Sequence, residues 1–331
     1  MTAGRAAEIA GVDDVDLTGT TALVTGATDG IGRETALALG RLGATVLVHG
    51  RDRAKGEEVV ERLREMGTGG AELYLASFEE VETVAELATT VGSEHERLDV
   101  LVNNAGGYFR EGRLTSGGVE RTFAVNHLAS FVLTLELLPN LRAGSGRVVT
   151  VSSEAHRGGE LPVVEPEGDA ESDAADANGN AALDTDALCS IADFSGWDAY
   201  SRSKLANVLF TVELADRLST TAITANCCHP GVVLGSGFTR NMNLPARTLT
   251  WLLSWAPKWL PRPFVDTPAK AAATQTYLSA SPDLADTTGG YFSDCEQDDP
   301  DERAEDSELR AALWDASVEL VDIELAEIPS R

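Results

Sequence analysis

Short Val-rich runs alternate with longer helical stretches along this chain, and this alternation limits the fold more than any other feature. The runs include TALVT, TVLVHG, DVLVNNAG and RVVTVSS. Continuously apolar runs of this kind are typical of strands buried on both faces of a parallel sheet. Strands that alternate with helices build βαβ units. We therefore predict an α/β fold of the Rossmann type, with a doubly wound, mostly parallel sheet flanked by helices.

The length of 331 residues suits one large domain with a well-buried core. We predict an N-terminal extension over residues 1–17 and a single domain over 18–331. Between residues 158 and 201 there are 11 acidic residues and no Lys or Arg. Such a stretch has little apolar surface to bury, so we predict an acidic surface insertion at about 158–196.

The acidic composition excludes one class of partner. The chain has 26 Lys and Arg against 53 Asp and Glu, a formal net charge of −27. This surface repels nucleic acid, so we expect no such partner. It would also repel itself in dilute buffer, whereas at molar salt the screening length falls to about 3 Å. We therefore hypothesise a halophilic source; an ordinary acidic protein is the alternative.

The sequence lacks the features that mark membrane-spanning, secreted and metal-binding proteins. No apolar run approaches the roughly 20 residues that a membrane span needs. The first residues lack the basic start and apolar block of a signal peptide. The four cysteines form no C-x-x-C pair, and we expect inert thiols and no metal site. These features predict a cytoplasmic protein without stable membrane insertion.

A glycine-rich loop, TGATDGIG, joins the first predicted strand to a helix. A dinucleotide pyrophosphate would meet a helix N-terminus at this point. Glycines there permit a tight turn and close backbone approach. The loop supplies the first candidate cofactor-binding residues, which are Gly26, Thr28, Asp29, Gly30, Ile31 and Gly32.

The end of the second predicted strand bears on the choice of cofactor. An acidic residue there would bind a ribose hydroxyl of NAD, whereas a basic residue would accommodate the 2′-phosphate of NADP. Gly50 stands where the acid is expected, and Arg51 follows it. We predict NADP(H), with NAD(H) the less favoured alternative because Asp29 adds a negative charge to the loop.

Several further motifs follow one another along the chain in an order that can be compared with known families. Asn103-Asn104-Ala105-Gly106 ends one strand, Asn126 follows in a helix, and Ser152-Ser153 ends the next strand. Tyr200 and Lys204 stand four residues apart in YSRSK, on one face of a helix, and HPG follows a later strand. In this order the motifs resemble the short-chain dehydrogenase/reductase family from about residue 18 to the C-terminus. The strings HGRD, SKLAN and GYFSDC resemble its retinol-dehydrogenase-like and WW-domain-oxidoreductase-like members.

The resemblance implies a reaction and roles for its residues. Tyr200 would be the general acid/base, and Lys204 would lower the pKa of Tyr200 and bind the nicotinamide ribose. Ser153 would hydrogen-bond the substrate oxygen, and Asn126 would hold a water in a proton relay. The expected reaction is the NADP(H)-dependent interconversion of a carbonyl and an alcohol. A non-catalytic NADP(H)-binding redox-sensing regulator is the alternative, although it would need none of these four residues.

The resemblance also implies further cofactor contacts and an oligomer. Tyr200 and Lys204 would touch the cofactor, and relatives pair as homodimers or homotetramers. The remaining expected contacts are Leu75, Asn104, Ala105, Gly106, Pro230, Gly231 and Val232.

The chain departs from the family pattern in two respects. Tyr74 replaces an aspartate expected at the adenine, and the gap between Ser153 and Tyr200 is unusually long. Alternation on a strand lets only one of Ser152 and Ser153 face the cleft, and family position selects Ser153. We interpret His156 as a surface residue or as one that supports the serine from behind.

The segment at about 232–266 corresponds to the family's substrate-binding region, and we expect it to form a lid. Trp251, Trp255 and Trp259 recur at intervals of four residues within it. They favour an apolar ketone, aldehyde or alcohol as substrate. Ordinary packing, a dimer contact and a shallow contact with a membrane are the alternatives.

The halophile hypothesis has a direct test. Because salt screens the repulsion between acidic groups, we expect the free energy of unfolding to rise as KCl is increased to molar concentration. Thermal unfolding over a KCl series measures this, and equal stability at low and molar salt would exclude the hypothesis.

Overall fold

The computed structural model describes residues 5–67, 69–164, 182–231, 233, 266–325 and 329–330. Within them, one eight-stranded sheet has the order β3-β2-β1-β4-β5-β6-β7-β8. Strands β1 to β7 run parallel, and β8 pairs antiparallel with β7. The strands are β1 (Thr21–Val24), β2 (Thr45–Gly50), β3 (Gly70–Leu75), β4 (Val100–Asn103), β5 (Arg147–Val151), β6 (Thr224–His229), β7 (Tyr291–Ser293) and β8 (Glu296–Asp298). The predicted doubly wound, mostly parallel sheet is confirmed.

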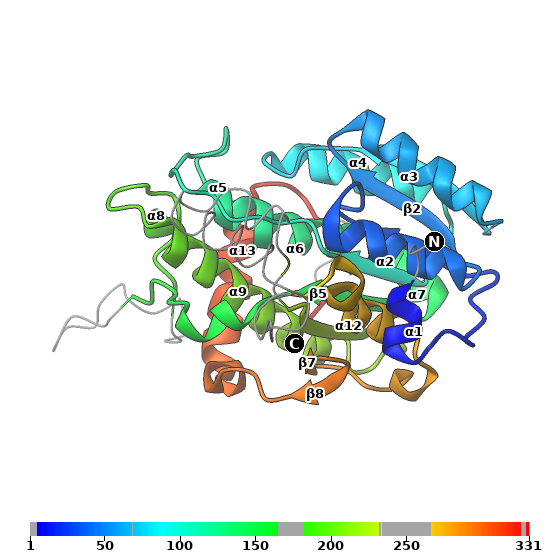
Figure 1. The fold of residues 1–331 in the computed structure, drawn as a ribbon. Coiled ribbons are helices and arrows are strands. Elements are labelled where there is room, and N and C mark those ends of the chain that lie inside the picture. The colour runs from blue at the N-terminus through cyan, green and yellow to red at the C-terminus, as the bar shows by residue number, and fades with distance from the viewer. Residues whose placement is uncertain are drawn as a thin grey trace, which may run out of the picture.

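Helices cover both faces of the sheet (Figure 1). The core on one face includes side chains of α1, α2, α3 and α12, and the core on the other includes side chains of α4, α6, α9 and α13. The α-helices are α1 (Arg5–Ala10), α2 (Gly30–Arg41), α3 (Arg53–Glu65), α4 (Val81–Glu94), α5 (Arg121–Phe123), α6 (Ala129–Glu136), α7 (Leu138–Gly144), α8 (Thr185–Leu188), α9 (Gly196–Arg217), α12 (Pro268–Ala280) and α13 (Ser307–Val321). A π-helical turn, η1 (Ala124–Leu128), joins α5 to α6, and the 3₁₀ turns are η2 (Glu154–Gly158), η3 (Pro282–Leu284) and η4 (Glu302–Glu305).

The central strands show why apolar runs predicted this architecture. On β1, Ala22 and Val24 pack into one core and Leu23 into the other, and all three are fully buried. Successive side chains on a strand point to opposite faces, so a strand covered on both sides needs apolar residues at every position.

The arrangement of the strands creates the site. From β1 the chain builds outward through β2 and β3, then returns to place β4 on the other side of β1. The loops that leave β1 and β4 therefore diverge at the carboxyl edge of the sheet. Ligands of open α/β sheets bind at such a switch point.

The described part of the predicted N-terminal extension packs against the rest of the domain. Its helix α1 lies beside α12 (Figure 1), and Ala6 and Ala7 are buried there. The cysteines Cys227 and Cys228 are buried on β6, and burial raises the pKa of Cys227 to about 12. A thiol that stays protonated is a poor nucleophile, which agrees with the expectation of inert thiols.

Parts of two predicted segments lie outside the described residues. The acidic insertion is described only at its two ends, where Val163 and Leu183 form an antiparallel bridge. Of the predicted lid, only Val233 and Asp266 are described, and they form a parallel bridge. The residues outside the description include Val232, Trp251, Trp255 and Trp259.

No single helix among the described residues is long and apolar enough to cross a membrane. Two consecutive helical segments, Arg121–Glu136 and Leu138–Gly144, meet the criteria of length and composition only when taken together, and they are bent by 61°.

The C-terminal helix α13 closes one face of the core through Trp314. This side chain is 2% exposed, and its ring centroid lies 5.1 Å from that of Phe131 and 6.0 Å from that of Phe210. The guanidinium of Arg217 lies 4.2 Å from the Trp314 ring. Aromatic contacts of this kind add to the free energy gained by burial.

We predict that Trp314→Ala lowers the free energy of unfolding by about 3–5 kcal/mol, because it leaves a cavity in the core. Chemical denaturation measures the change. Trp197, which is 50% exposed, offers a matched control, and Trp197→Ala should change stability by less than about 0.5 kcal/mol. Equal losses in the two variants would contradict this packing role.

Candidate active site

The loop between β1 and α2 disfavours side chains at its glycines, either through a positive φ angle or through lack of space. Gly26 and Gly30 have φ angles of 63° and 57°, a region that favours glycine. A Cβ atom on Gly32 would lie 2.5 Å from the Gly26 carbonyl oxygen, and Asn104 donates a 2.8 Å hydrogen bond to the carbonyl of Thr25. The N-terminus of α2 therefore opens onto a cradle that backbone groups line, which fits a dinucleotide pyrophosphate.

The end of β2 lacks the acidic residue that binds NAD, because Gly50 stands at that position. A Cβ atom on Gly50 would overlap the side chain of Thr28 from the glycine loop. Arg51 follows and is exposed. Asp29, which caps α2, pairs with Lys55 at 2.8 Å, so its negative charge is offset locally. Asp29 therefore repels a 2′-phosphate less than its charge alone would suggest.

His49 supports the glycine loop, and the sequence analysis missed it. Its Nε2 lies 3.2 Å from the Ala76 carbonyl oxygen, and Nδ1 lies 3.4 Å from the Gly26 nitrogen. The carbonyl can only accept and the amide can only donate, so the ring carries its proton on Nε2. Burial lowers the pKa of His49 to about 4, so the ring is neutral at pH 7. A polar residue at a buried strand end was the only available signal.

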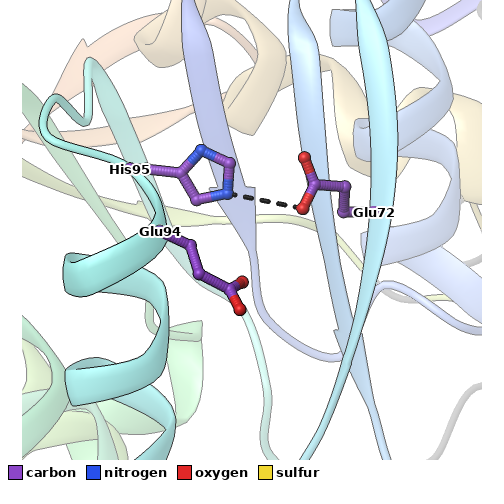
Figure 2. A group of neighbouring side chains, drawn as sticks. All are labelled: Glu72, Glu94 and His95. Atoms are coloured by element: carbon purple, nitrogen blue, oxygen red, sulfur yellow. Dashed lines mark ion pairs between the residues drawn. The ribbon is translucent and has the colours of Figure 1, made fainter.

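Tyr74 makes its polar contacts with β3 and with the end of α4. Its hydroxyl lies 2.6 Å from Glu94 Oε2, 2.9 Å from His95 Nε2 and 3.2 Å from Glu72 Oε2. Figure 2 shows these three partners, with His95 and Glu72 3.6 Å apart. Their ligand atoms are close enough to hold a cation. The Tyr74 hydroxyl has one proton, and the shorter distance favours its donation to Glu94 rather than to Glu72. At the end of β3, Leu75 is 37% exposed.

Ser152 and Ser153 face different partners at the end of β5. The Ser152 hydroxyl is buried and donates to the Lys204 carbonyl at 2.8 Å, which attaches α9 to the strand. Ser153 instead lies beside Tyr200, close enough to lower the pKa of its hydroxyl. Ser195 caps α9 by accepting from the amide of Asp198, and this fixes where the helix begins. The structure thus brings together Ser153, Tyr200 and Lys204.

The ionisation of Tyr200 and Lys204 differs from the sequence-based expectation. Burial raises the pKa of Tyr200 to about 12, although the nearby Ser153 side chain opposes the rise. Burial lowers the pKa of Lys204 to about 8. The Lys204 ammonium lies 5.8 Å from the centroid of the Tyr200 ring and donates to the Val151 carbonyl at 2.8 Å. In the protein alone, desolvation thus outweighs the attraction that was expected to lower the tyrosine pKa.

Asn126 lies in the π-helical turn η1, a type of irregularity common at functional sites. Its amide donates to the Gly107 carbonyl at 3.0 Å and to Ser203 Oγ at 2.9 Å, and it accepts from the Gly107 nitrogen at 2.8 Å. Both donors are therefore used by protein groups, and only the second lone pair of Oδ1 is left for the water that we expected. A Cβ atom on Gly106 would lie 3.0 Å from Asn126 Oδ1 and 3.7 Å from Lys204 Nζ.

The end of β6 borders the same site. The amide of Glu154 donates to His229 Nδ1 at 3.3 Å, so the turn after Ser153 contacts this strand end. Pro230 follows, and Gly231 has a φ of 83° with Asp266 against its α-carbon. These contacts place the described part of the predicted nicotinamide loop beside the serine.

Two aromatic side chains that the sequence analysis missed flank Tyr200. The ring centroid of Tyr108 lies 6.1 Å from that of Tyr200, and the centroid of Trp197 lies 6.2 Å from it. Trp197 remains half exposed. Its position three residues before Tyr200 on one helix was a usable signal, because such residues share a face.

Comparisons with known proteins agree with this geometry. A family model described as short chain dehydrogenase matches residues 20–162. Retinol dehydrogenase 14 of Mus musculus is 38% identical over 322 residues, covering 92% of this chain and 86% of the relative. The WW domain-containing oxidoreductase of Gallus gallus is 34% identical over 310 residues, covering 92% of this chain and 69% of the relative.

Solved structures are similar along most of the chain. An uncharacterised protein from Mycobacterium Paratuberculosis has a TM-score of 0.67 and 30% identity, covering 95% of this chain and 98% of its own. A RhlG/NADP active-site complex from Pseudomonas aeruginosa has a TM-score of 0.61 and 25% identity, covering 84% of this chain and 95% of its own.

Proposed function

Because this chain belongs to the short-chain dehydrogenase/reductase family and is an NAD(P)-dependent oxidoreductase, we propose that it uses NADP(H) to interconvert an apolar carbonyl compound and its alcohol. The observation that carries the proposal is the buried Tyr200, which has Ser153 beside its hydroxyl and the Lys204 ammonium 5.8 Å from its ring centroid. A bound nicotinamide supplies or accepts the hydride. The protein must then orient the carbonyl and move one proton at its oxygen.

Tyr200 provides that proton in the reductive direction. Its raised pKa of about 12 keeps the phenol protonated at pH 7, and a protonated phenol can donate to an oxygen that gains negative charge. Ser153 can hydrogen-bond the same oxygen because it already lies against the Tyr200 hydroxyl. Together the two groups fix the carbonyl oxygen and provide positioned proton transfer.

Lys204 stabilises the phenolate that Tyr200 becomes when it has donated its proton. With its pKa lowered to about 8, it remains mostly charged at pH 7. The phenolate formed by proton donation is buried, and a nearby ammonium favours this charged form. The carbonyl of Val151 holds the ammonium in place at 2.8 Å. Asn126 fixes the backbone of Gly107 beside these groups.

The preference for NADP(H) rests on the end of β2. Gly50 provides no carboxylate for a ribose hydroxyl, and the exposed Arg51 can pair with a 2′-phosphate. Support comes from two similar structures that contain NADP, the Pseudomonas aeruginosa complex and a gluconate 5-dehydrogenase from Beutenbergia cavernae at 25% identity and a TM-score of 0.61.

The apolar nature of the substrate follows from Tyr108 and Trp197 beside Tyr200. Aromatic rings at a half-exposed position offer apolar surface to a ligand that reaches the tyrosine hydroxyl. Relatives named for retinol, an apolar alcohol, support the same class of substrate.

We predict that Tyr200→Phe lowers turnover at least about 10²-fold, because it removes the positioned proton donor. NADPH should still bind, as measured by its fluorescence. Tyr277→Phe on α12, on the opposite face of the sheet, serves as the matched control and should keep its activity. Retained turnover in Tyr200→Phe would exclude this mechanism.

We also predict that Arg51→Ala raises KM for NADPH about 10- to 100-fold, the effect of one charge-assisted hydrogen bond, and leaves KM for NADH unchanged. Arg53→Ala is the control, since the exposed Arg53 pairs with Glu57 on its own helix. Equal effects of Arg51→Ala on the two cofactors would contradict a 2′-phosphate contact.

A further inference from the structure

His156 lies directly behind Ser153 and is fully buried, which excludes the surface position that we considered for it. Its Nδ1 lies 2.7 Å from the carbonyl oxygen of Ser153, and its Nε2 lies 3.0 Å from the backbone nitrogen of Asp301. The ring therefore connects the serine to a residue 145 positions later in the chain.

These two contacts define the protonation state of the ring. The Ser153 carbonyl can only accept a hydrogen bond, so Nδ1 carries the proton. The amide of Asp301 can only donate, so Nε2 offers its lone pair. A neutral imidazole satisfies both partners, whereas a protonated one would point a second N–H at the Asp301 amide. Protonation would therefore break the connection to Asp301.

The surroundings favour the neutral ring. Burial is the largest influence and lowers the pKa of His156, and the positive charge of Arg157 acts in the same direction. The carboxylates of Glu154 and Asp301 and the hydrogen bond to Ser153 oppose the shift. The titratable and charged groups around the ring are Glu154 and Arg157 on η2, Tyr291 on β7, His229 on β6, Asp301, and Arg303 on η4.

The segment over residues 299–303, which we call the clamp, holds the whole turn after Ser153. Arg303 donates to the carbonyls of Gly159 and of Arg157, the latter at 3.0 Å. In return, Arg157 donates to the Asp299 carbonyl at 2.7 Å. On β7 the Tyr291 hydroxyl donates to Glu154 at 2.7 Å. The turn is thus fastened from the C-terminal part of the chain.

We propose that neutral His156 is a positioning residue that holds Ser153 in its working orientation, and that the clamp keeps His156 in place. The proposal rests on the proposed function, because it assigns Ser153 a part in the reaction. A shift of about 1 Å in a reacting group can cost about 10²-fold in rate. Loss of the hydrogen bond between Asp301 and His156 should therefore lower kcat and leave NADPH binding unchanged.

Asp301 allows a test that changes one backbone donor. Its φ of −61° is compatible with proline, so Asp301→Pro removes the N–H that reaches His156 and puts the proline Cδ in its place, which pushes the His156 ring away. Asp301→Ala is the matched control, because it also loses the carboxylate but keeps the N–H. We expect kcat of Asp301→Pro to be about 10- to 100-fold below that of Asp301→Ala, with equal affinity for NADPH. Equal kcat values would overturn the proposal.

The pH profile separates positioning from a merely structural effect. The Asp301 N–H disfavours a proton on Nε2 of His156, because both groups would then be donors. Asp301→Pro lacks this N–H, so the pKa of His156 should be higher in Asp301→Pro than in Asp301→Ala. Because the neutral ring is the working form, the acid limb of kcat should then lie at higher pH in Asp301→Pro. An acid limb at the same pH in both variants would contradict the proposal.

Imidazole ¹⁵N chemical shifts of the wild-type protein give a test that needs no activity. The chain has only 5 histidines, so assignment is practical. We expect His156 to show a protonated Nδ1 and an unprotonated Nε2 at pH 7. The opposite tautomer would overturn the proposal even if the protein is an active reductase. Absence of turnover in the wild type, with this tautomer present, would instead refute the proposed function.

Discussion

Helix α9 is fastened to the end of β5 by three hydrogen bonds, and the arrangement of the site depends on them. Ser152 donates to the carbonyl of Lys204, and Lys204 and Asn207 both donate to the carbonyl of Val151 at 2.8 and 3.2 Å. All four residues are buried, so these polar groups have no water to replace a lost partner. The attachment places Tyr200, one turn earlier on α9, against Ser153.

Burial then determines the ionisation of the groups that would act. The tyrosine is held as a phenol, the pKa of Lys204 falls close to neutrality, and His49 and His156 are favoured in their neutral forms. The two histidines carry their protons on different nitrogens because their backbone partners differ. One ring supports the glycine loop and the other supports the serine, so the two halves of the site are stabilised by similar means.

The sheet and the main site residues could be predicted because their signals are local. Apolar runs mark buried strands, glycines mark the loop before α2, and the spacing of Tyr200 and Lys204 marks one helix face. His49, Trp197 and the clamp on His156 depend on contacts between distant parts of the chain, such as the 145 positions between His156 and Asp301. The pKa of Tyr200 in the protein alone differs from the expectation for the same reason, since desolvation depends on the packing around the hydroxyl and cannot be read from a nearby lysine.

The central claim is that this site reduces apolar carbonyl compounds with NADPH. The most direct measurement is NADPH consumption, followed at the nicotinamide absorbance band, over a panel of aldehydes and ketones of graded size and polarity. The account predicts turnover with apolar members of the panel and little with small polar ones. No consumption across the panel, despite measurable NADPH binding, would contradict it and would favour a non-catalytic regulator that binds NADP(H).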